Sequence, residues 1–202
     1  NNVAVGDKAL TANTTASNNT AVGDQALEAN STGQQNVAFG SGALTSNTTA
    51  NYNNAIGAFT LRDNTTGANN TALGHGALLV NTTASNNTGV GFNALISNTT
   101  GAANVAVGAY ALDASTTESY ITAVGSYALT ANTTGTKCAA FGSGSLQSNT
   151  TGNYNTGCGS YALSANTTAS YNTAVGRSAM SQNTTGAENT AVGYGALNDN
   201  VD

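Results

Sequence analysis

The unit that decides the fold is written most plainly in residues 18–34, NNTAVGDQALEANSTGQ. Its Ala-Val-Gly core returns with a constant 17-residue period, without insertion or deletion, so the chain forms twelve units of which the last is incomplete. We number the places in each unit 1 to 17, with the invariant glycine at position 6. These glycines are Gly6, Gly23, Gly40, Gly57, Gly74, Gly91, Gly108, Gly125, Gly142, Gly159, Gly176 and Gly193. Self-similarity at a fixed short period is the signature of a repeat architecture.

Comparison of the units separates constrained positions from free ones. Position 4 is always Ala or Gly, position 5 is apolar, position 10 is Leu except at Met180, and position 13 is Asn except at Ser115. Positions 1, 7, 8, 11 and 17 vary freely. We therefore predict that the constrained positions face inward and the free ones face outward. The expected core residues include Val5, Val22, Leu10 and Leu27, with turns at Gly6, Gly23, Gly40 and Gly57, where a positive φ or a close chain approach favours glycine.

The residue pattern excludes helices and favours short strands. Gly, Asn and Thr are poor helix formers, and no apolar spacing of three and four residues is present. Stretches such as residues 19–22 and 26–28 predict strands, and Gly and the Asn-Thr-Thr-Gly segments predict the turns between them. We expect one all-β domain over residues 1–202, a parallel β-solenoid or β-roll in which each 17-residue unit makes one coil of two strands and two turns,.

The charge content excludes several partners. Only 6% of the residues are charged, the net charge is −5, and the four basic residues are scattered as Lys8, Arg62, Lys137 and Arg177. Nucleic acid and anionic membrane surfaces require clusters of Lys and Arg. No apolar run approaches the roughly 20 residues of a membrane span. We expect no nucleic-acid partner and no membrane insertion within this chain.

The narrow apolar content of each unit predicts association. Each unit offers two large apolar side chains, at positions 5 and 10, beside small residues at positions 4 and 9. This burial is small against the conformational entropy lost in ordering a whole unit. Association would merge several narrow cores, so we predict an obligate homo-oligomer.

The motif resembles that of known fibrous proteins. Residues 4–9, AVGDKA, and residues 174–179, AVGRSA, are similar to the head repeat of trimeric autotransporter adhesins (YadA-like heads). The longer Asn-Thr-Ala-Val-Gly…Asn-Thr-Thr-Gly version resembles repeats of phage tail-fibre and bacterial surface-fibre proteins. The resemblance implies a left-handed parallel β-roll, three chains around one axis, and an extracellular place on a cell surface or virion. We expect a fragment of a longer fibre, a structural shaft or head that mediates surface attachment.

No residue set predicts catalysis, a cofactor or a metal. His75 is the only histidine, the nine carboxylates are dispersed, and no base stands beside the serines,. We expect a protein that is not an enzyme.

The two cysteines are not expected to form a disulfide. Cys138 and Cys158 fall about 10 Å apart laterally in adjacent coils, beyond disulfide reach. Cys158 is expected to replace Val in the core, with an interchain thiol cluster as the alternative.

The Asn-Thr-Thr segments have several interpretations. Asn13, Asn30 and Asn47, with their equivalents, begin formal glycosylation sequons,. Stacked Asn side chains would also cap turns and form a hydrogen-bonded ladder. Rows of Thr raise ice binding as a minor alternative, although adjacent threonines such as Thr14 and Thr15 would point in opposite directions in a strand.

Aromatic residues gather at the variable positions 1, 7 and 8. Tyr52, Tyr110, Tyr127 and Tyr161 are examples, and their positions also accept Lys, Gln or Ser. We expect them to be at least partly exposed. They could bind a surface glycan or a host receptor, which makes a binding module the alternative function; otherwise they cover the coil or pack between chains.

Overall fold

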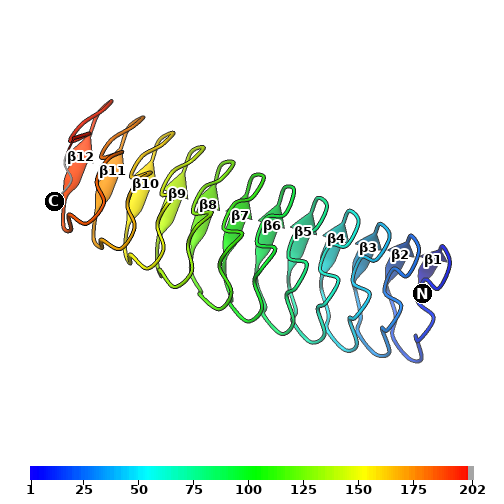
Figure 1. The fold of residues 1–202 in the computed structure, drawn as a ribbon. Coiled ribbons are helices and arrows are strands. Elements are labelled where there is room, and N and C mark those ends of the chain that lie inside the picture. The colour runs from blue at the N-terminus through cyan, green and yellow to red at the C-terminus, as the bar shows by residue number, and fades with distance from the viewer. Residues whose placement is uncertain (200–202) are drawn as a thin grey trace.

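The computed structural model describes residues 1–199 and folds them into one continuous rod, with the first and last strands at opposite ends of the rod (Figure 1). Each coil contributes one short strand. The strands are β1 (Val3–Val5), β2 (Thr20–Val22), β3 (Val37–Phe39), β4 (Asn54–Ile56), β5 (Thr71–Leu73), β6 (Thr88–Val90), β7 (Val105–Val107), β8 (Thr122–Val124), β9 (Ala139–Phe141), β10 (Thr156–Cys158), β11 (Thr173–Val175) and β12 (Thr190–Val192).

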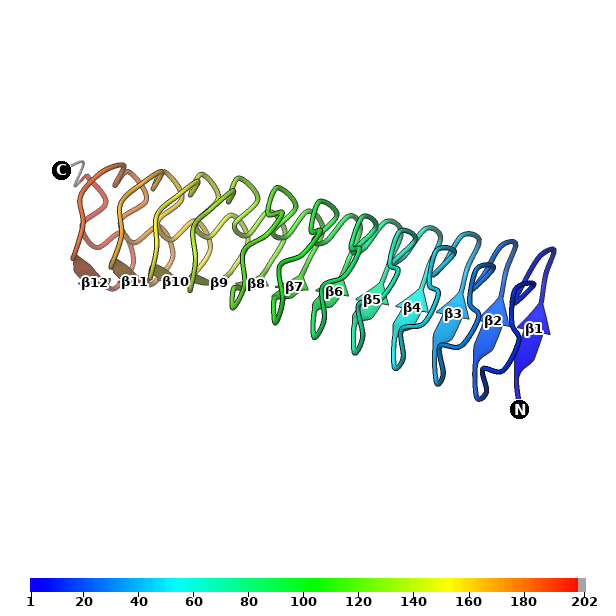
Figure 2. The same cartoon turned by 90° about the horizontal axis from the view of Figure 1, so that it is seen from below.

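The strands form one parallel sheet in chain order, which runs along one side of the rod (Figure 2). Val3 pairs with Thr20 and Thr20 with Val37, so each strand residue lies beside its equivalent in the next unit. The predicted all-β parallel solenoid, with one 17-residue unit per coil, is therefore confirmed.

The prediction of a second strand in each coil is wrong. Residues 26–28 form a turn, and Leu27 has a φ of 52°. Left-handed backbone at positions 8 and 10 bends the chain too sharply for a strand. Hydrogen bonds between coils nevertheless continue there, since the Leu27 N–H donates to the Ala43 carbonyl at 3.0 Å and the Ala29 N–H donates to the Thr45 carbonyl at 3.0 Å.

The core is thinner than the sequence suggests. Position 4 points inward and is fully buried, as at Ala21 and Ala106, and position 10 supplies the large buried side chains, among them Leu10 and Leu27. Position 5 does not join them, contrary to our expectation. Val5 is 58% exposed and Val22 is half-buried. Successive residues of a strand face opposite sides, so a strand that buries position 4 turns position 5 outward.

Both cysteines are free, as expected from their separation, but their environments differ from our expectation. Cys138 is buried, whereas Cys158 is exposed because it occupies position 5. The thiol of Cys158 is therefore not a substitute for a core valine. Burial raises the pKa of the Cys138 thiol, which favours its neutral form,.

The glycines at position 6 stack directly on one another. At Gly108 φ is +135°, and a Cβ built there would lie 2.5 Å from the carbonyl carbon of Gly125. Neither the backbone conformation nor the neighbouring coil leaves room for a side chain.

The part of the chain that the structure describes contains no helix with the length and apolar character needed to span a membrane.

Gly108→Ala should therefore destabilise the rod by roughly 3 kcal/mol, because it combines strain at positive φ with a backbone clash. Gly76→Asn is the matched control, since Gly76 lies at position 8 of an internal coil, a Cβ there would meet chiefly the side-chain end of Asn93, and Asn93 itself shows that this position accepts Asn. Thermal and denaturant unfolding followed by circular dichroism measures both. Equal losses in the two variants would contradict the proposed role of position 6.

Candidate functional site

The outer face of the sheet carries a continuous line of apolar side chains. We call it the apolar stripe, and it consists of the position 5 residues Val5, Val22, Phe39, Ile56, Leu73, Val90, Val107, Val124, Phe141, Cys158, Val175 and Val192. Phe39 is 56% exposed and Phe141 is 44% exposed, while Val90, Val107 and Val124 are half-buried. No element of the described chain covers this face (Figure 2). The rod therefore presents an apolar line on this face that is exposed in eight coils and half-buried in coils 2, 6, 7 and 8.

A ladder of asparagines runs inside the rod at position 13. The Asn81 side-chain amide donates to the Ala84 carbonyl of its own coil at 3.0 Å and to the Asn64 side-chain oxygen of the preceding coil at 2.9 Å. Asn30 and Asn47 belong to the same buried ladder, with the Asn47 amide donating to the Asn30 oxygen at 2.9 Å. Asn13 lies in the first coil, half-buried, and donates to the Ala16 carbonyl at 3.3 Å.

A glycan on these amides would disrupt the ladder. Attachment to the side-chain nitrogen replaces one donated proton, and the nitrogen of a ladder asparagine such as Asn81 donates twice inside the rod. Buried acceptors that lose their donor cost free energy. The folded geometry therefore favours the structural interpretation of the Asn-Thr-Thr segments.

A second asparagine ladder lies at position 2, where none was expected. The Asn53 side-chain amide donates to the Gly67 carbonyl at 2.8 Å, and its side-chain oxygen accepts from the Asn70 N–H at 2.9 Å. The signal was present in the sequence, because position 2 is Asn in every unit except at Ile121 and Cys138.

Asn81→Ala should destabilise the rod by about 2–4 kcal/mol, since it leaves two buried acceptors without this donor. Asn86→Ala is the control: Asn86 is exposed at position 1, where the next coil carries Ala103, and a change within about 1 kcal/mol is expected,. Denaturant unfolding measures both. If Asn81→Ala is as mild as Asn86→Ala, the ladder does not stabilise the coil.

Coil 7, residues 103–119, departs from the ladder, and its own side chains compensate for this only in part. Ser115 replaces the position 13 asparagine, and Glu118 replaces the small residue at position 16. The Glu118 carboxylate accepts from the Ser115 hydroxyl at 3.3 Å, from the Thr117 N–H at 3.1 Å and from the Thr117 hydroxyl at 2.8 Å. The side-chain oxygen of Asn98, in the preceding coil, is left buried without a hydrogen-bond partner.

The environment of Glu118 favours its ionised form. Burial acts to raise its pKa, but the hydrogen bonds donated by the Thr117 hydroxyl and by neighbouring backbone N–H groups outweigh burial, so the pKa lies below its usual value,. A carboxyl group with a lowered pKa in the folded state adds stability above its unfolded pKa. That contribution is lost as the pH falls through the folded pKa.

The stability advantage of the wild type over Glu118→Gln should therefore shrink as the pH is lowered from about 6 to about 3. Glutamine keeps the size of the side chain but does not titrate, which makes it the appropriate reference. Denaturant unfolding at several pH values measures the difference. A difference that stays constant over this range would contradict the account of Glu118.

Five aromatic rings form a row on five successive coils. We call this set the aromatic row: Phe59, His75, Phe92, Tyr110 and Tyr127. Their consecutive ring centroids are 5.7, 5.5, 5.3 and 5.3 Å apart. Tyr110 is half-buried and the other four residues are exposed. The structure thus brings together Tyr110 and Tyr127 with Phe59 and Phe92, which also belong to the aromatic residues expected at positions 7 and 8, and with His75, which does not.

The other predicted aromatic residues lie outside this row. Tyr161 is two coils beyond Tyr127, with its ring over Gly144, and Tyr52 is 55% exposed at position 1. Position 1 carries a smaller group in which Tyr154 and Tyr171 stack at 5.0 Å. The Lys137 amine lies 5.0 Å from the Tyr154 ring centroid.

The threonine rows differ from our expectation. Positions 14 and 15 form a bend rather than a strand. The hydroxyl at position 14 donates a hydrogen bond to the next coil, as from Thr48 to the Thr65 carbonyl at 3.2 Å. The side chain at position 15 is exposed. The two adjacent rows therefore do not present a broad array of free hydroxyls, and the geometry gives no added support to ice binding.

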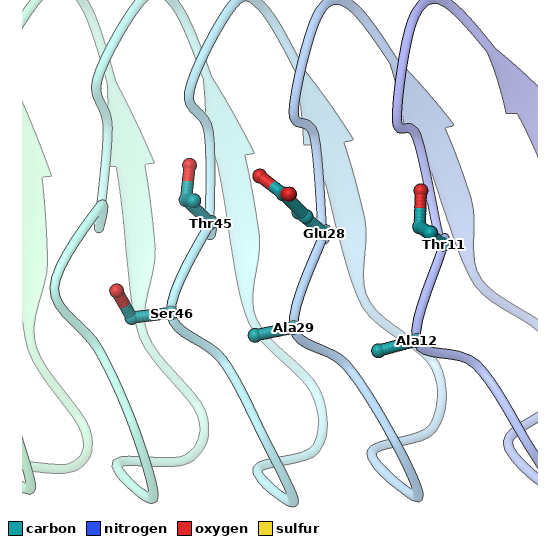
Figure 3. A pocket seen from close by; sticks show the side chains of 6 residues that line it. All are labelled: Thr11, Ala12, Glu28, Ala29, Thr45 and Ser46. Atoms are coloured by element: carbon teal, nitrogen blue, oxygen red, sulfur yellow. The ribbon is translucent and has the colours of Figure 1, made fainter.

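A shallow groove crosses the first three coils at positions 11 and 12 (Figure 3). It is lined by Thr11, Ala12, Glu28, Ala29, Thr45 and Ser46. Glu28 is its only titratable side chain, so the lining offers no acid–base pair or nucleophile with a base. Within residues 1–199, no group of three His, Cys, Asp or Glu residues could hold a metal ion.

The chain matches no protein-family model, no curated protein and no solved structure. The similarity to adhesin heads therefore rests on the repeat motif alone. The apolar stripe recurs in every coil, whereas coil 7 and the aromatic row are local departures from the repeat.

Proposed function

We propose that this chain is a structural rod of an extracellular fibre or adhesin, in which copies associate along the apolar stripe into a homo-oligomer, with three copies favoured. The observation that carries the proposal is the stripe, because every coil places an apolar side chain on the same face, exposed in eight coils and half-buried in coils 2, 6, 7 and 8. Contiguous apolar surface of this kind on a soluble protein marks an interaction site. The number three comes from the resemblance to adhesin heads.

The chemistry of the sheet face favours a second copy of the chain as the partner. Positions 3 and 5 carry no charged residue in any unit. Packing two such faces would bury no unpaired charge and oppose no like charges. The stripe also has the period of the coil, so a parallel copy in register meets apolar side chains at every step. A short or irregular partner could cover only part of it.

A rod of this kind works mechanically. The backbone hydrogen bonds that join one coil to the next continue from the first strand to the last, and the glycines at position 6 leave no room for a side chain between successive coils. Association along the stripe would thicken the rod and bury the surface that a single copy exposes. The variable positions would then be free to carry recognition.

Light scattering in solution tests the proposal, with an expected mass of three times the 19.8 kDa chain. The triple variant Phe39→Thr, Ile56→Thr and Leu73→Thr should shift the mass towards that of the single chain, because Thr keeps strand propensity but removes apolar area. The double control Tyr154→Asn and Tyr171→Asn should keep the wild-type mass. A well-folded wild-type monomer would overturn the proposal.

Cys158 gives an independent check of the same contact. It lies exposed on the stripe, whereas Cys138 is buried. A short bifunctional maleimide should link chains through Cys158 if copies meet in parallel and in register, and Cys158→Val should abolish the link. Linkage of the wild type no greater than that of Cys158→Val would contradict parallel association.

A further inference from the structure

We infer that the aromatic row is a binding platform for a neutral, linear glycan that lies along the rod. This inference goes beyond the structural role, because the stripe uses position 5 whereas the row uses positions 7 and 8. It does not depend on the number of chains in the fibre. It requires only that the row stays accessible in whatever assembly forms.

The fold does not need these rings. In other coils the same positions hold Ser41, Ser143 and Ser178, and glycine at Gly42 and Gly144. Five successive coils with a ring at position 7 or 8 are thus a local departure from the repeat. A concentration of exposed aromatic side chains that packing does not require points to recognition.

The geometry suits an extended ligand. Ring-to-ring separations of 5.3 to 5.7 Å follow the advance of the coils, so the rings recur along the rod axis rather than around it. One sugar unit of a β-linked chain advances by a similar length. His75 stacks on Phe92 at 16° and Tyr110 stacks on Tyr127 at 13°. Phe59 meets His75 at 86° and Phe92 meets Tyr110 at 71°, so the row consists of two stacked pairs joined by edge-to-face contacts and is not one continuous stack. Phe59 is 39% exposed, and Phe92 and Tyr127 are each 46% exposed, so the row keeps apolar ring surface against which the C–H groups of a sugar can pack,.

The polar groups beside the rings suit sugar hydroxyls. Tyr110 and Tyr127 carry phenol groups, His75 carries a ring nitrogen, and the carboxamide of Asn93 lies over Gly76 within the same segment. Each can donate and accept hydrogen bonds. In coils 4–8, positions 7 and 8 hold no Asp, Glu, Lys or Arg. The platform therefore favours an uncharged ligand over an acidic glycan or a charged peptide.

Calorimetric titration of the full chain with hexamers of β-1,4-linked glucose and of β-1,4-linked N-acetylglucosamine tests the inference. The wild type should bind at least one of them. The triple variant Phe92→Ser, Tyr110→Asn and Tyr127→Asn should lose at least about tenfold in affinity, because it removes three stacking faces. Each new residue already stands at the same position elsewhere, as Ser143 and Asn93, so the coil is expected to fold.

The control is Tyr154→Asn with Tyr171→Asn, which removes exposed stacked rings at position 1 and should change affinity by less than about twofold,. Circular dichroism must show that each variant is folded. The inference is overturned if neither hexamer binds the wild type, or if the row variant binds as the wild type does. It also fails if the row variant alone loses the wild-type oligomeric mass, since the rings would then pack between chains. The apolar stripe is judged separately, by the mass of its own variant.

Discussion

Parallel hydrogen bonding between each coil and the next is the constraint on which the rest of the structure depends. The strands pair only with the strands of neighbouring coils, and the turns also donate across to the next coil. The chain must therefore return to the same place once in every unit. That requirement explains the positive φ values at positions 1, 8 and 10, the glycine contacts at position 6 and the two asparagine ladders.

Much of the fold could be predicted from the sequence, because a constraint that recurs in every coil leaves its mark in every unit. The constant period, the need for glycine at position 6 and the buried Leu27 all follow from comparing units. The apolar residues at positions 9 and 10 do not by themselves tell a turn from a second strand. Its absence has a subtler signal: positions 1, 8 and 10 hold no Val, Ile or Thr in any unit, as expected where left-handed backbone disfavours β-branched side chains,.

The site was less predictable than the fold. Position 5 was assigned to the core because it is apolar in every unit, although strand alternation with the invariably small position 4 already indicates that it faces outward. Phe39 and Cys158 are therefore surface residues and not core residues. The aromatic row could not be derived from any single position, because two of its rings are at position 7 and three are at position 8. They form a row only when the coils are stacked.

The repeat and the departures from it carry different parts of the account: position 5 recurs in every unit and forms the apolar stripe, whereas the aromatic row is confined to coils 4–8. In coil 7 the two unusual residues bond to each other, since the Ser115 hydroxyl donates to the Glu118 carboxylate. The rings of the aromatic row, by contrast, stand at positions where other coils hold Ser or Gly. A rigid stack places every surface side chain at a fixed interval, so a few substitutions on adjacent coils are enough to build an extended surface.

Electron–electron distance measurements between spin labels test the central claim, the stacking of each coil directly on the next, most directly. Labels at the exposed position 15 of coils 2 and 6 (Thr32→Cys and Thr100→Cys) and of coils 2 and 10 (Thr32→Cys and Thr168→Cys) would be compared in a Cys158→Val background, diluted with unlabelled protein. Stacking at the strand spacing predicts separations of about 19 Å and about 38 Å. Separations that do not double with the number of coils would contradict the account.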